Sequence, residues 1–412
     1  MSDADAFLRR IFDRAVEVAD PMQTLSAHLP ERPDGRLIVI GAGKASARMA
    51  EAVEAAWGPC EGLVITRYGY ARPCAGIEIV EAAHPVPDDT GVAATRRMLD
   101  LVAELGAGDT VLALISGGGS ALLCAPAGEI TLAEKQALTQ NLLASGAPIG
   151  DINGIRKALS EVKGGHLAAA AYPAQVHALL ISDVPGDDPG DIASGPTEGH
   201  AGDTARALDT LARWGVTPAP AIKAWLEAGG DPVAPDDTRL AHTANRIIAA
   251  PSQSLAAAAA LAPDHDVRIL GDAIEGEARD IAARHAALAL EAQRSAKRPT
   301  LLLSGGELTV TKRGDGTGGP NAEYALALAL ALDGAPGIHA IACDTDGVDG
   351  AAEVAGAIIG PRTLEGLRSE AEAALATNDA HTFFARARSQ VVPGPTLTNV
   401  NDFRAILVLP TG

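Results

Sequence analysis

Short apolar runs and longer helical patterns alternate along the whole chain. Val111–Ile115 is apolar at every position, which is typical of a strand buried on both faces of a parallel sheet. Similar runs predict strands at residues 37–40, 62–66, 77–80, 175–181, 246–250, 267–270, 300–303, 338–343 and 405–409, and a helical period predicts helices at 46–57, 91–105, 131–144, 151–171, 252–261 and 275–296. Strands that alternate with helices predict an α/β fold with mostly parallel pairing in the first half.

A run of glycines follows the strand at Val111–Ile115. The segment reads Ser116-Gly117-Gly118-Gly119-Ser120, and Ala121, Leu122 and Leu123 then indicate a helix or another buried segment. Glycine lets the backbone turn sharply and approach a ligand closely, and a strand, a turn and a helix start together form a ready anion site. The alternative is a tight connection that needs glycine only for packing.

A second strand-turn-helix segment surrounds Lys44. The turn Gly41-Ala42-Gly43-Lys44-Ala45-Ser46 lacks the third glycine of a dinucleotide-binding loop, which would stand at Ser46. It also lacks the first glycine and the Ser or Thr of a nucleotide-triphosphatase loop. Lys44 could still place its ammonium on a phosphate or a carboxylate, although a solvated surface lysine is the ordinary alternative.

The predicted helix at residues 151–171 carries several basic side chains, among them Arg156 and Lys163. Gly164 and Gly165 directly follow Lys163, and each glycine inside a helix costs about 1 kcal/mol relative to alanine. We therefore expect a close approach to a neighbouring helix or a ligand at this point.

An acidic loop follows the strand at residues 175–181. Asp183, Asp187, Asp188 and Asp191 lie at the carboxyl end of that strand, where open α/β sheets bind their ligands. Carboxylates there could hold Mg²⁺, which takes one or two carboxylates together with substrate phosphates. A solvated turn is the alternative, because Asp, Pro and Gly are ordinary turn formers.

The second half repeats these features. An apolar strand runs into Ser304-Gly305-Gly306-Glu307, and Asn321 could cap the helix that follows the next glycine loop. Asp344-Thr-Asp346-Gly-Val-Asp349-Gly350 resembles the start of a calcium-binding EF-hand loop, but position twelve is Ala355 instead of Glu. We therefore reject a calcium site and expect a loop of acids that faces a cleft.

Composition narrows the class of protein. The chain has 412 residues, which favours two domains, and a net charge of −19, which argues against nucleic-acid and anionic-membrane partners. The four cysteines form no metal-ligand pattern, and no signal peptide or apolar run of spanning length is present, so we expect a cytoplasmic protein. The turn-rich stretch from Glu227 to Thr238 predicts domains at residues 1–238 and 239–412.

Eight segments, in order along the chain, resemble the class II glycerate 2-kinases of the MOFRL type. They are GAGKAS (41–46), HPVPD (84–88), ISGGGSALL (115–123), ALSEVKGGHLA (158–168), ISDVPGDDPGDIASGPT (181–197), LSGGELTV (303–310), DTDGVDG (344–350) and TNVNDF (398–403). The resemblance implies a Rossmann-like first domain, a mixed-sheet second domain, and an active site in the cleft between them. It also implies phosphorylation of the 2-hydroxyl of D-glycerate by ATP with Mg²⁺. Some members of the family are labelled hydroxypyruvate reductases.

The resemblance implies a catalytic role for Lys44, and the motifs described above lead us to expect roles for the other residues. Lys44, Asp183 and Arg156 are expected to be catalytic, and Asp183, Asp187 and Asp188 are expected to hold Mg²⁺. The residues expected to bind the cofactor are Gly41, Gly43, Ser116, Gly117, Gly118, Gly119, Ser120, Lys163, Glu307, Asn321, Asp344 and Asp346. The anion at the three glycines, a carboxylate or a phosphate, stays open, and so does a homodimer.

One position departs from the family pattern. Many members carry an arginine where this chain has Pro320, and Arg313 or Arg156 could replace its charge. Two other functions remain as alternatives: reduction of hydroxypyruvate by NAD(P)H, and sensing of a sugar acid or nucleotide without catalysis. The missing third glycine at Ser46 argues against the reductase.

Overall fold

The computed structural model describes residues 2–201 and 204–410, which divide into two compact units. The parallel-sheet unit comprises Thr24–Ser182 and Asp187–Ile248. The mixed-sheet unit comprises the N-terminal residues through Gln23, the short stretch Asp183–Gly186, and the chain from Ala249 onward. No helix in the described part of the chain is both long and apolar enough to cross a bilayer.

The parallel-sheet unit is built on a six-stranded sheet within the described residues, in the order β3-β2-β1-β4-β5-β6. Its first five strands pair in parallel, and β4 is buried at every position, as predicted from its unbroken apolar run. The strands are β1 (Leu37–Ala42), β2 (Glu61–Arg67), β3 (Ile77–Ala82), β4 (Thr110–Ile115), β5 (Gln175–Ile181) and β6 (Thr243–Ala249).

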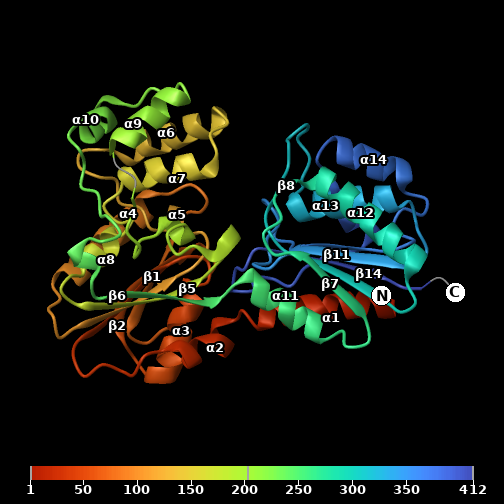
Figure 1. Cartoon of the computed structure of the whole chain (residues 1–412), viewed down its shortest axis with the longest axis horizontal. Coiled ribbons are helices and arrows are strands. Elements are labelled where there is room, and N and C mark those ends of the chain that lie inside the picture. Colours follow the sequence, from red (N-terminus) through yellow and green to blue (C-terminus); the bar gives the residue numbers. More distant parts are fainter. Residues whose placement is uncertain (1, 202–203, 411–412) are drawn as a thin grey trace. The chain divides into compact units, whose positions relative to one another are not determined.

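Helices connect these strands and add a separate helical layer. Helices α6, α7, α9 and α10 pack around their own apolar cluster, which includes Leu138, Leu142, Ile155 and Leu211 (Figure 1). The helices are α3 (Ser46–Trp57), α4 (Asp89–Ala103), α5 (Gly119–Leu122), α6 (Leu132–Ala144), α7 (Ile149–Ala158), α8 (His166–Ala170), α9 (Thr204–Arg213) and α10 (Pro220–Glu227), with the short 3-10 turns η1 (Leu25–His28), η2 (Pro185–Asp187), η3 (Ile192–Ser194) and η4 (Thr238–Leu240).

The prediction of one helix over residues 151–171 is wrong. Helix α7 ends at Ala158, and α8 begins only at His166. Gly164 and Gly165 lie between them with φ of 56° and 88°, a left-handed conformation that glycine adopts readily and that cannot continue a right-handed helix. Lys163 is therefore in a loop and not on a helix face.

The mixed-sheet unit contains a six-stranded sheet in the described residues, in the order β13-β12-β11-β14-β9-β7. Strands β7 and β9 are parallel, whereas the other pairs are antiparallel. The strands are β7 (Asp266–Gly271), β9 (Thr300–Ser304), β11 (Ile338–Asp344), β12 (Gly356–Ile359), β13 (Gln390–Val391) and β14 (Asp402–Val408), and a separate small pair is β8 (Gly276–Glu277) with β10 (Leu308–Thr309).

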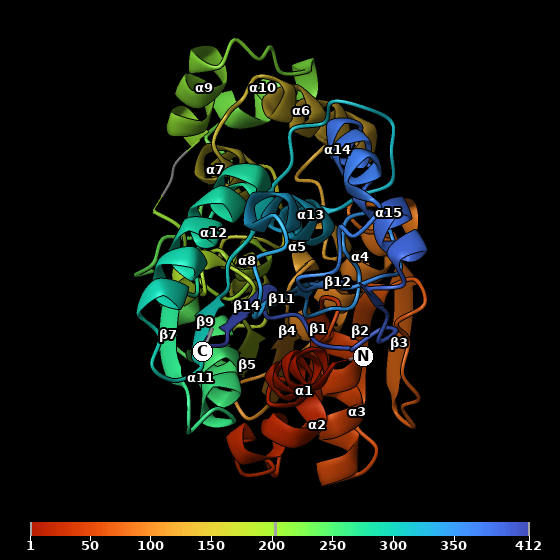
Figure 2. The ribbon, with the colours of Figure 1, turned by 90° about the vertical axis from the view of Figure 1, so that its right-hand side faces the viewer.

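Helices cover both faces of this sheet, so its strands are apolar on both sides. Leu302 of β9 belongs to the apolar cluster on one face, and Leu301 and Leu303 belong to the cluster on the other, which follows from the two-residue period of a strand. Helices α12 and α13 cover the first face, and α1 and α11 cover the second (Figures 1 and 2). The helices are α1 (Asp3–Glu17), α2 (Pro21–Thr24), which lies at the unit boundary, α11 (Pro251–Ala260), α12 (Ala278–Ser295), α13 (Pro320–Leu332), α14 (Arg368–Ala376) and α15 (Ala380–Ala387).

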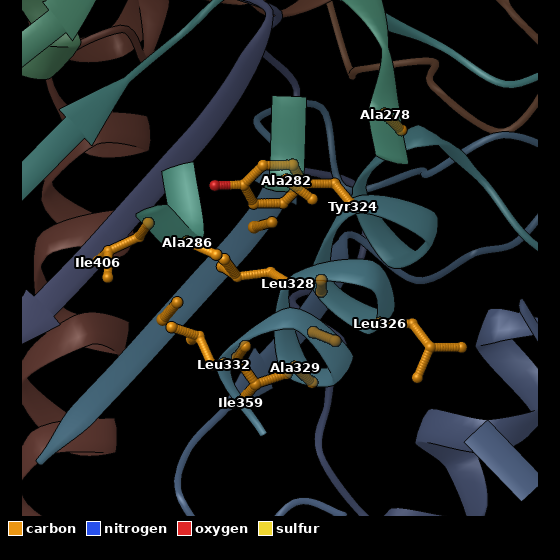
Figure 3. Close-up of a cluster of buried hydrophobic side chains, with 14 of the residues drawn as sticks. Ala278, Ala282, Ala286, Tyr324, Leu326, Leu328, Ala329, Leu332, Ile359 and Ile406 are labelled. Atoms are coloured by element: carbon orange, nitrogen blue, oxygen red, sulfur yellow. The ribbon is translucent and has the colours of Figure 1, made fainter. Parts of the chain in front are cut away.

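Small residues let α12 approach α13 closely. Ala278, Ala282 and Ala286 recur every four residues and form one stripe of α12, which faces Tyr324 and Leu328 of α13 (Figure 3). This contact explains the alanine-rich composition of this part of the chain by packing.

The division into units differs from the predicted domains at three places. Residues 239–248, which include most of β6, belong to the parallel-sheet unit and not to the second domain. Helix α1 packs within the mixed-sheet unit, because Leu8, Ile11 and Phe12 contribute to its core. Asp183–Gly186 also belongs to that unit. An apolar stripe such as that of α1 indicates that a helix is covered, but it carries no information about which sheet the helix covers. The predicted fold class, an α/β protein with one parallel and one mixed sheet, is confirmed.

Candidate functional site

The two glycines of the Gly41–Ser46 segment have a packing role. A Cβ on Gly41 would lie 2.3 Å from the carbonyl oxygen of Leu114, and one on Gly43 would lie 2.1 Å from Ser116 Oγ. The same hydroxyl accepts a hydrogen bond from Ala45 N–H (3.0 Å) and lies 3.2 Å from Ser46 Oγ. Ser116 therefore fills the space at the start of α3 where dinucleotide-binding folds place a pyrophosphate.

The turn after β4 brings together residues from three predicted motifs. Gly118 has φ of 80°, and a Cβ on it would lie 3.1 Å from both His84 Nε2 and Lys44 Cγ. The backbone N–H of Lys44 donates to the carbonyl oxygen of Gly117 (2.8 Å). Lys44 and His84 thus lie against this glycine.

The same turn leaves hydrogen-bond donors unused. Within the described residues, no acceptor lies against the backbone N–H of Gly117, Gly118 or Ser120. Two of these residues, Gly118 and Ser120, line a cavity of about 340 Å³. Backbone donors without partners at a cavity wall suit an anion.

Three basic side chains line this cavity beside the turn. They come from three different segments, namely Lys135 of α6, Arg156 of α7 and Lys163 of the loop before α8. None of the three forms an ion pair with a carboxylate of the described residues. The remainder of the wall is largely apolar and includes Pro85, Val86, Ala121, Leu132 and Leu143.

Lys163 is the most deeply buried of the three. Its ammonium donates to the carbonyl oxygens of Ser120 and Leu123, each at 2.8 Å, and so holds both ends of the short helix α5. An ammonium has three N–H groups, so these two bonds leave one for the cavity. Burial, followed by repulsion from Lys135, lowers the pKa of Lys163 to about 7.

The other two basic residues are also partly deprived of water. Lys135 is 7% exposed and donates to the carbonyl oxygen of Leu159 (3.0 Å), and burial lowers its pKa. Burial also lowers the pKa of Arg156, which makes one long hydrogen bond of 3.4 Å to Asn153 Oδ1. Mutual repulsion among buried cations costs folding free energy, and an anion in the cavity would offset that cost.

A loop with a strained, left-handed backbone contacts the side chain of Ser120. Ala193, Ser194 and Gly195 have φ of 53°, 64° and 60°, and the left-handed conformation costs an L-residue about 1–2 kcal/mol. The Ser194 hydroxyl lies 2.8 Å from the Ser120 hydroxyl. Gly119 allows this contact, because a Cβ there would lie 2.6 Å from the Cβ of Ala193.

The predicted metal ligands lie in two different units. Asp183 belongs to the mixed-sheet unit, where Asn399 Nδ2 donates to its carboxylate (2.9 Å) and Asn401 Nδ2 donates to its carbonyl oxygen (3.0 Å). Asp187 and Asp188 belong to the parallel-sheet unit.

The carboxylates of Asp187 and Asp188 differ in their surroundings. Asp187 Oδ1 is buried without a hydrogen-bond partner, whereas Asp188 is exposed and accepts a hydrogen bond from Gly190 N–H (2.8 Å). In the described part of the chain, no group of three or more His, Cys, Asp or Glu side chains is placed to hold a metal ion.

One predicted ligand residue of the mixed-sheet unit, Asn321, belongs to a buried polar network. Asn321 does not cap α13 as predicted, since Pro320 is its first residue and Gly319 its N-cap. Asn321 instead donates from Nδ2 to Asp402 Oδ1 (2.6 Å), and Asp402 pairs with the buried Arg404 (2.9 Å).

Backbone N–H groups donate hydrogen bonds to most of the carboxylates of the acidic loop in this unit. Asp349 accepts the N–H groups of Asn321 (3.0 Å) and Ala322 (2.8 Å), so a carboxylate already occupies the start of α13. Asp346 accepts from Val348 N–H (2.8 Å), and Asp344 accepts from Asp346 N–H (2.9 Å). Glu307 is exposed.

Sequence reasoning found part of the cavity and missed part of it. Gly118, Ser120, Arg156 and Lys163 were predicted and line the cavity, and Lys44 lies beside it. Lys135 was missed, although it stands on the apolar stripe of α6 with Leu132 and Leu138, an unusual place for an ammonium. Ser194 was also missed, because nothing in its sequence context shows that it contacts Ser120.

Comparisons with known families cover most of the chain. Residues 7–227 match the model of DUF4147, a domain of unknown function, and residues 300–402 match the MOFRL family.

Individual relatives match over nearly their full lengths. A protein of Agrobacterium vitis named "Putative hydroxypyruvate reductase" is 50% identical over 97% of this chain and 94% of its own. The D-glycerate 2-kinase of Thermotoga maritima is 36% identical over 95% of each chain. A crystal structure of glycerate kinase from Thermotoga maritima matches with a TM-score of 0.89 and 34% identity, over 98% of this chain and 99% of that one.

Proposed function

Because the chain belongs to the MOFRL family of glycerate kinases, we propose that it transfers a phosphoryl group from ATP to the 2-hydroxyl of D-glycerate, giving 2-phosphoglycerate. The observation that carries this proposal is the basic cavity of the parallel-sheet unit. In a chain with a net charge of −19, two buried lysines and one half-buried arginine line one cavity, and none of them pairs with a carboxylate of the described residues. Both substrates of the reaction are anions.

The cavity supports a function in binding the negative part of a substrate. Lys163 offers its third N–H, Arg156 offers a guanidinium, and Gly118 and Ser120 offer backbone N–H groups. A carboxylate of glycerate and a phosphate of ATP share this chemistry. Phosphoryl transfer requires mainly positioning and charge stabilisation from a protein, which fixed hydrogen-bond donors and cations supply.

Lys44 is proposed to neutralise charge that develops on the transferred group. Its position against Gly118 places it next to the cavity wall, on the first turn after β1. Arg156 is proposed to supply the charge that an arginine at the Pro320 position supplies in many family members, since it lines the cavity, whereas Arg313 is exposed in the mixed-sheet unit.

The acidic loop after β5 has donors that fit Mg²⁺. Asp187 has a buried carboxylate oxygen without a partner, and Asp183 has a carboxylate oriented by Asn399. Asp188 is a third candidate. Mg²⁺ prefers such oxygen ligands and usually takes only one or two carboxylates with phosphate oxygens and water. When bound, it would neutralise phosphate charge, and the loop carboxylates would hold it.

A coupled assay of ADP release tests the proposal. D-glycerate should give ADP release, and enolase should consume the product directly, because 2-phosphoglycerate is its substrate. Lys44→Ala should lose at least about a hundredfold in kcat, a typical cost of removing a charge that stabilises a transition state. Lys223→Ala, at an exposed lysine paired with Glu227, should retain activity. A product that enolase accepts only after a mutase step would contradict transfer to the 2-hydroxyl.

A reductase is the second candidate, since the relative with 50% identity carries that name. The strand order β3-β2-β1-β4-β5-β6 is also that of dinucleotide-binding sheets. The Ser116 hydroxyl at the start of α3 and the buried Ser46 in the place of the third glycine argue against it. Oxidation of NADH or NADPH by hydroxypyruvate, without ADP release from ATP and glycerate, would favour the reductase.

A further inference from the structure

We propose that Ser194 is a positioning residue that turns the hydroxyl group of Ser120 toward the basic cavity, so that Ser120 donates its proton to a bound anion. The inference rests on the proposed anion-binding function of that cavity. The positioning residue, Ser194, does not itself line the cavity.

Ser120 is held from two sides. Lys163 Nζ donates to its carbonyl oxygen at 2.8 Å, and the hydroxyl of Ser194 lies 2.8 Å from its own hydroxyl. The first contact fixes the backbone of Ser120, and the second leaves its side chain one favoured direction.

The direction of the hydrogen bond between the two serines follows from burial. Ser194 is 0% exposed, and its hydroxyl has no other acceptor within the described residues. If Ser120 were the donor, the proton of Ser194 would be buried without an acceptor, which is costly. Ser194 is therefore the donor. Ser120 is half-buried at the cavity wall, so its own proton is available to a ligand there.

The backbone around Ser194 is built to hold this geometry. Gly164 N–H donates to the carbonyl oxygen of Ser194 (3.0 Å), and Gly165 N–H donates to that of Gly195 (2.8 Å). These are the two glycines that follow Lys163. The loop of Lys163 is thus hydrogen-bonded to the left-handed loop of Ser194. One side chain from each loop, Lys163 and Ser194, contacts Ser120. Strain that the surroundings maintain is typical of functional sites.

A double-mutant cycle on anion affinity tests the proposal in the full-length protein. The probes are inorganic phosphate, ADP and D-glycerate, each measured by titration calorimetry. Ser120→Ala and Ser194→Ala should each weaken binding of at least one probe by about tenfold to a hundredfold, the effect of one hydrogen bond to an ionised group. The double variant should bind no more weakly than Ser120→Ala alone, because Ser194 acts only through Ser120.

Two further variants separate positioning from a structural role. Ser194→Gly removes the hydroxyl but favours the left-handed backbone, so it should be more stable than Ser194→Ala and yet bind equally weakly. Ser254→Ala removes a buried serine whose hydroxyl donates to Ala15 in the mixed-sheet unit (2.7 Å), and it should lose stability without losing anion affinity.

Three results would overturn the proposal. They are additive losses of affinity at Ser120 and Ser194, unchanged affinity in Ser194→Ala, and affinity that changes in parallel with stability across the unmodified protein, Ser194→Ala and Ser194→Gly. Absence of binding of all three probes to the unmodified protein would overturn both this inference and the proposed function. Binding with a non-additive cycle but no ADP release would support this inference and contradict the kinase.

Discussion

Ala45 N–H donates a hydrogen bond of 3.0 Å to the side chain of Ser116, which stands 71 residues later in the chain. This bond joins the end of β4 to the start of α3 and gives the N–H group of Ala45, the N-cap residue of that helix, a partner. Ser46 Oγ lies 3.2 Å from the same hydroxyl. The Gly41–Ser46 segment, which has the appearance of a phosphate-binding turn, therefore holds the sheet and the helix together.

Replacement of Ser116 by alanine is expected to reduce stability. A buried N–H group would lose its acceptor, so we expect a loss of about 1–2 kcal/mol in the free energy of unfolding, measured by urea denaturation. Lys223→Ala, at an exposed position of the same unit, is the control and should change stability little. If Ser116→Ala kept full stability but lost anion affinity, Ser116 would be a ligand-binding residue.

The fold could be predicted from the sequence where local pattern and global packing agree. Helix α3 and strand β5 have the predicted bounds, because their apolar periods are long and glycine or turn residues flank them. Helix α6 lies within the predicted range of 131–144, and a capping box of Thr131 and Glu134 marks its start. The helix across Gly164 failed because left-handed glycine conformations depend on tertiary hydrogen bonds, here to Ser194 and Gly195.

The site could be predicted only where the residues that form it are consecutive in the sequence. The Ser116–Ser120 glycine run identified one wall of the cavity, although Ser116 itself faces α3. Folding alone brings Lys135 of α6 to that wall and Ser194, from a loop after β5, into contact with Ser120. Sequence also could not show that Asn321 uses its amide inside a buried network with Asp402.

Anion affinity is expected to fall as the pH rises through about 7. The pKa of Lys163 is lowered to about 7, so its charge and its third N–H are lost above that pH, and an anion binds the protonated form better. Sulfate is a suitable probe because its charge does not change between about pH 6 and pH 9. Its affinity should fall by about tenfold for each unit by which the bound anion raises the pKa of Lys163.

Two variants check that Lys163 is the group responsible. Lys163→Arg keeps its charge at every pH in this range, so the dependence on pH should disappear. Lys163→Met should bind sulfate weakly at all of these pH values. An unchanged pH dependence in Lys163→Met would assign it to another group, with Lys135 and Cys124 as the titratable neighbours.

Lys135→Met is expected to raise stability and lower function together. The ammonium of Lys135 is buried among other cations, and removal of an unpaired buried charge should add about 1 kcal/mol to the free energy of unfolding. The carbonyl oxygen of Leu159, which Lys135 contacts, keeps a second donor in Ala127 N–H (3.3 Å). Sulfate affinity should fall by about tenfold, because one charge leaves the cavity.

The control for Lys135→Met is Lys223→Met at an exposed position, where neither stability nor sulfate affinity should change. Urea denaturation and calorimetry measure the two effects separately. A Lys135→Met protein that loses stability would show that the ammonium is held by interactions that outweigh its burial, and the basic cavity would then be a structural feature.

Asp349 is expected to be a structural carboxylate and not a calcium ligand. Its two oxygens accept the N–H groups of Asn321 and Ala322, and His381 Nε2 lies 3.1 Å from one of them. Asp349→Ala would leave these groups buried without partners, so we expect a loss of at least about 3 kcal/mol, measured by urea denaturation. Asp349→Asn keeps one acceptor and should lose less stability, and Asp315→Ala, at a fully exposed position of the same unit, should lose no measurable stability.

Calcium at about 1 mM should leave the stability of the unmodified protein unchanged, since the carboxylate oxygens of Asp349 already accept hydrogen bonds and Ala355 supplies no ligand. A rise in stability with calcium that Asp349→Asn abolishes would show that the loop opens to bind the ion.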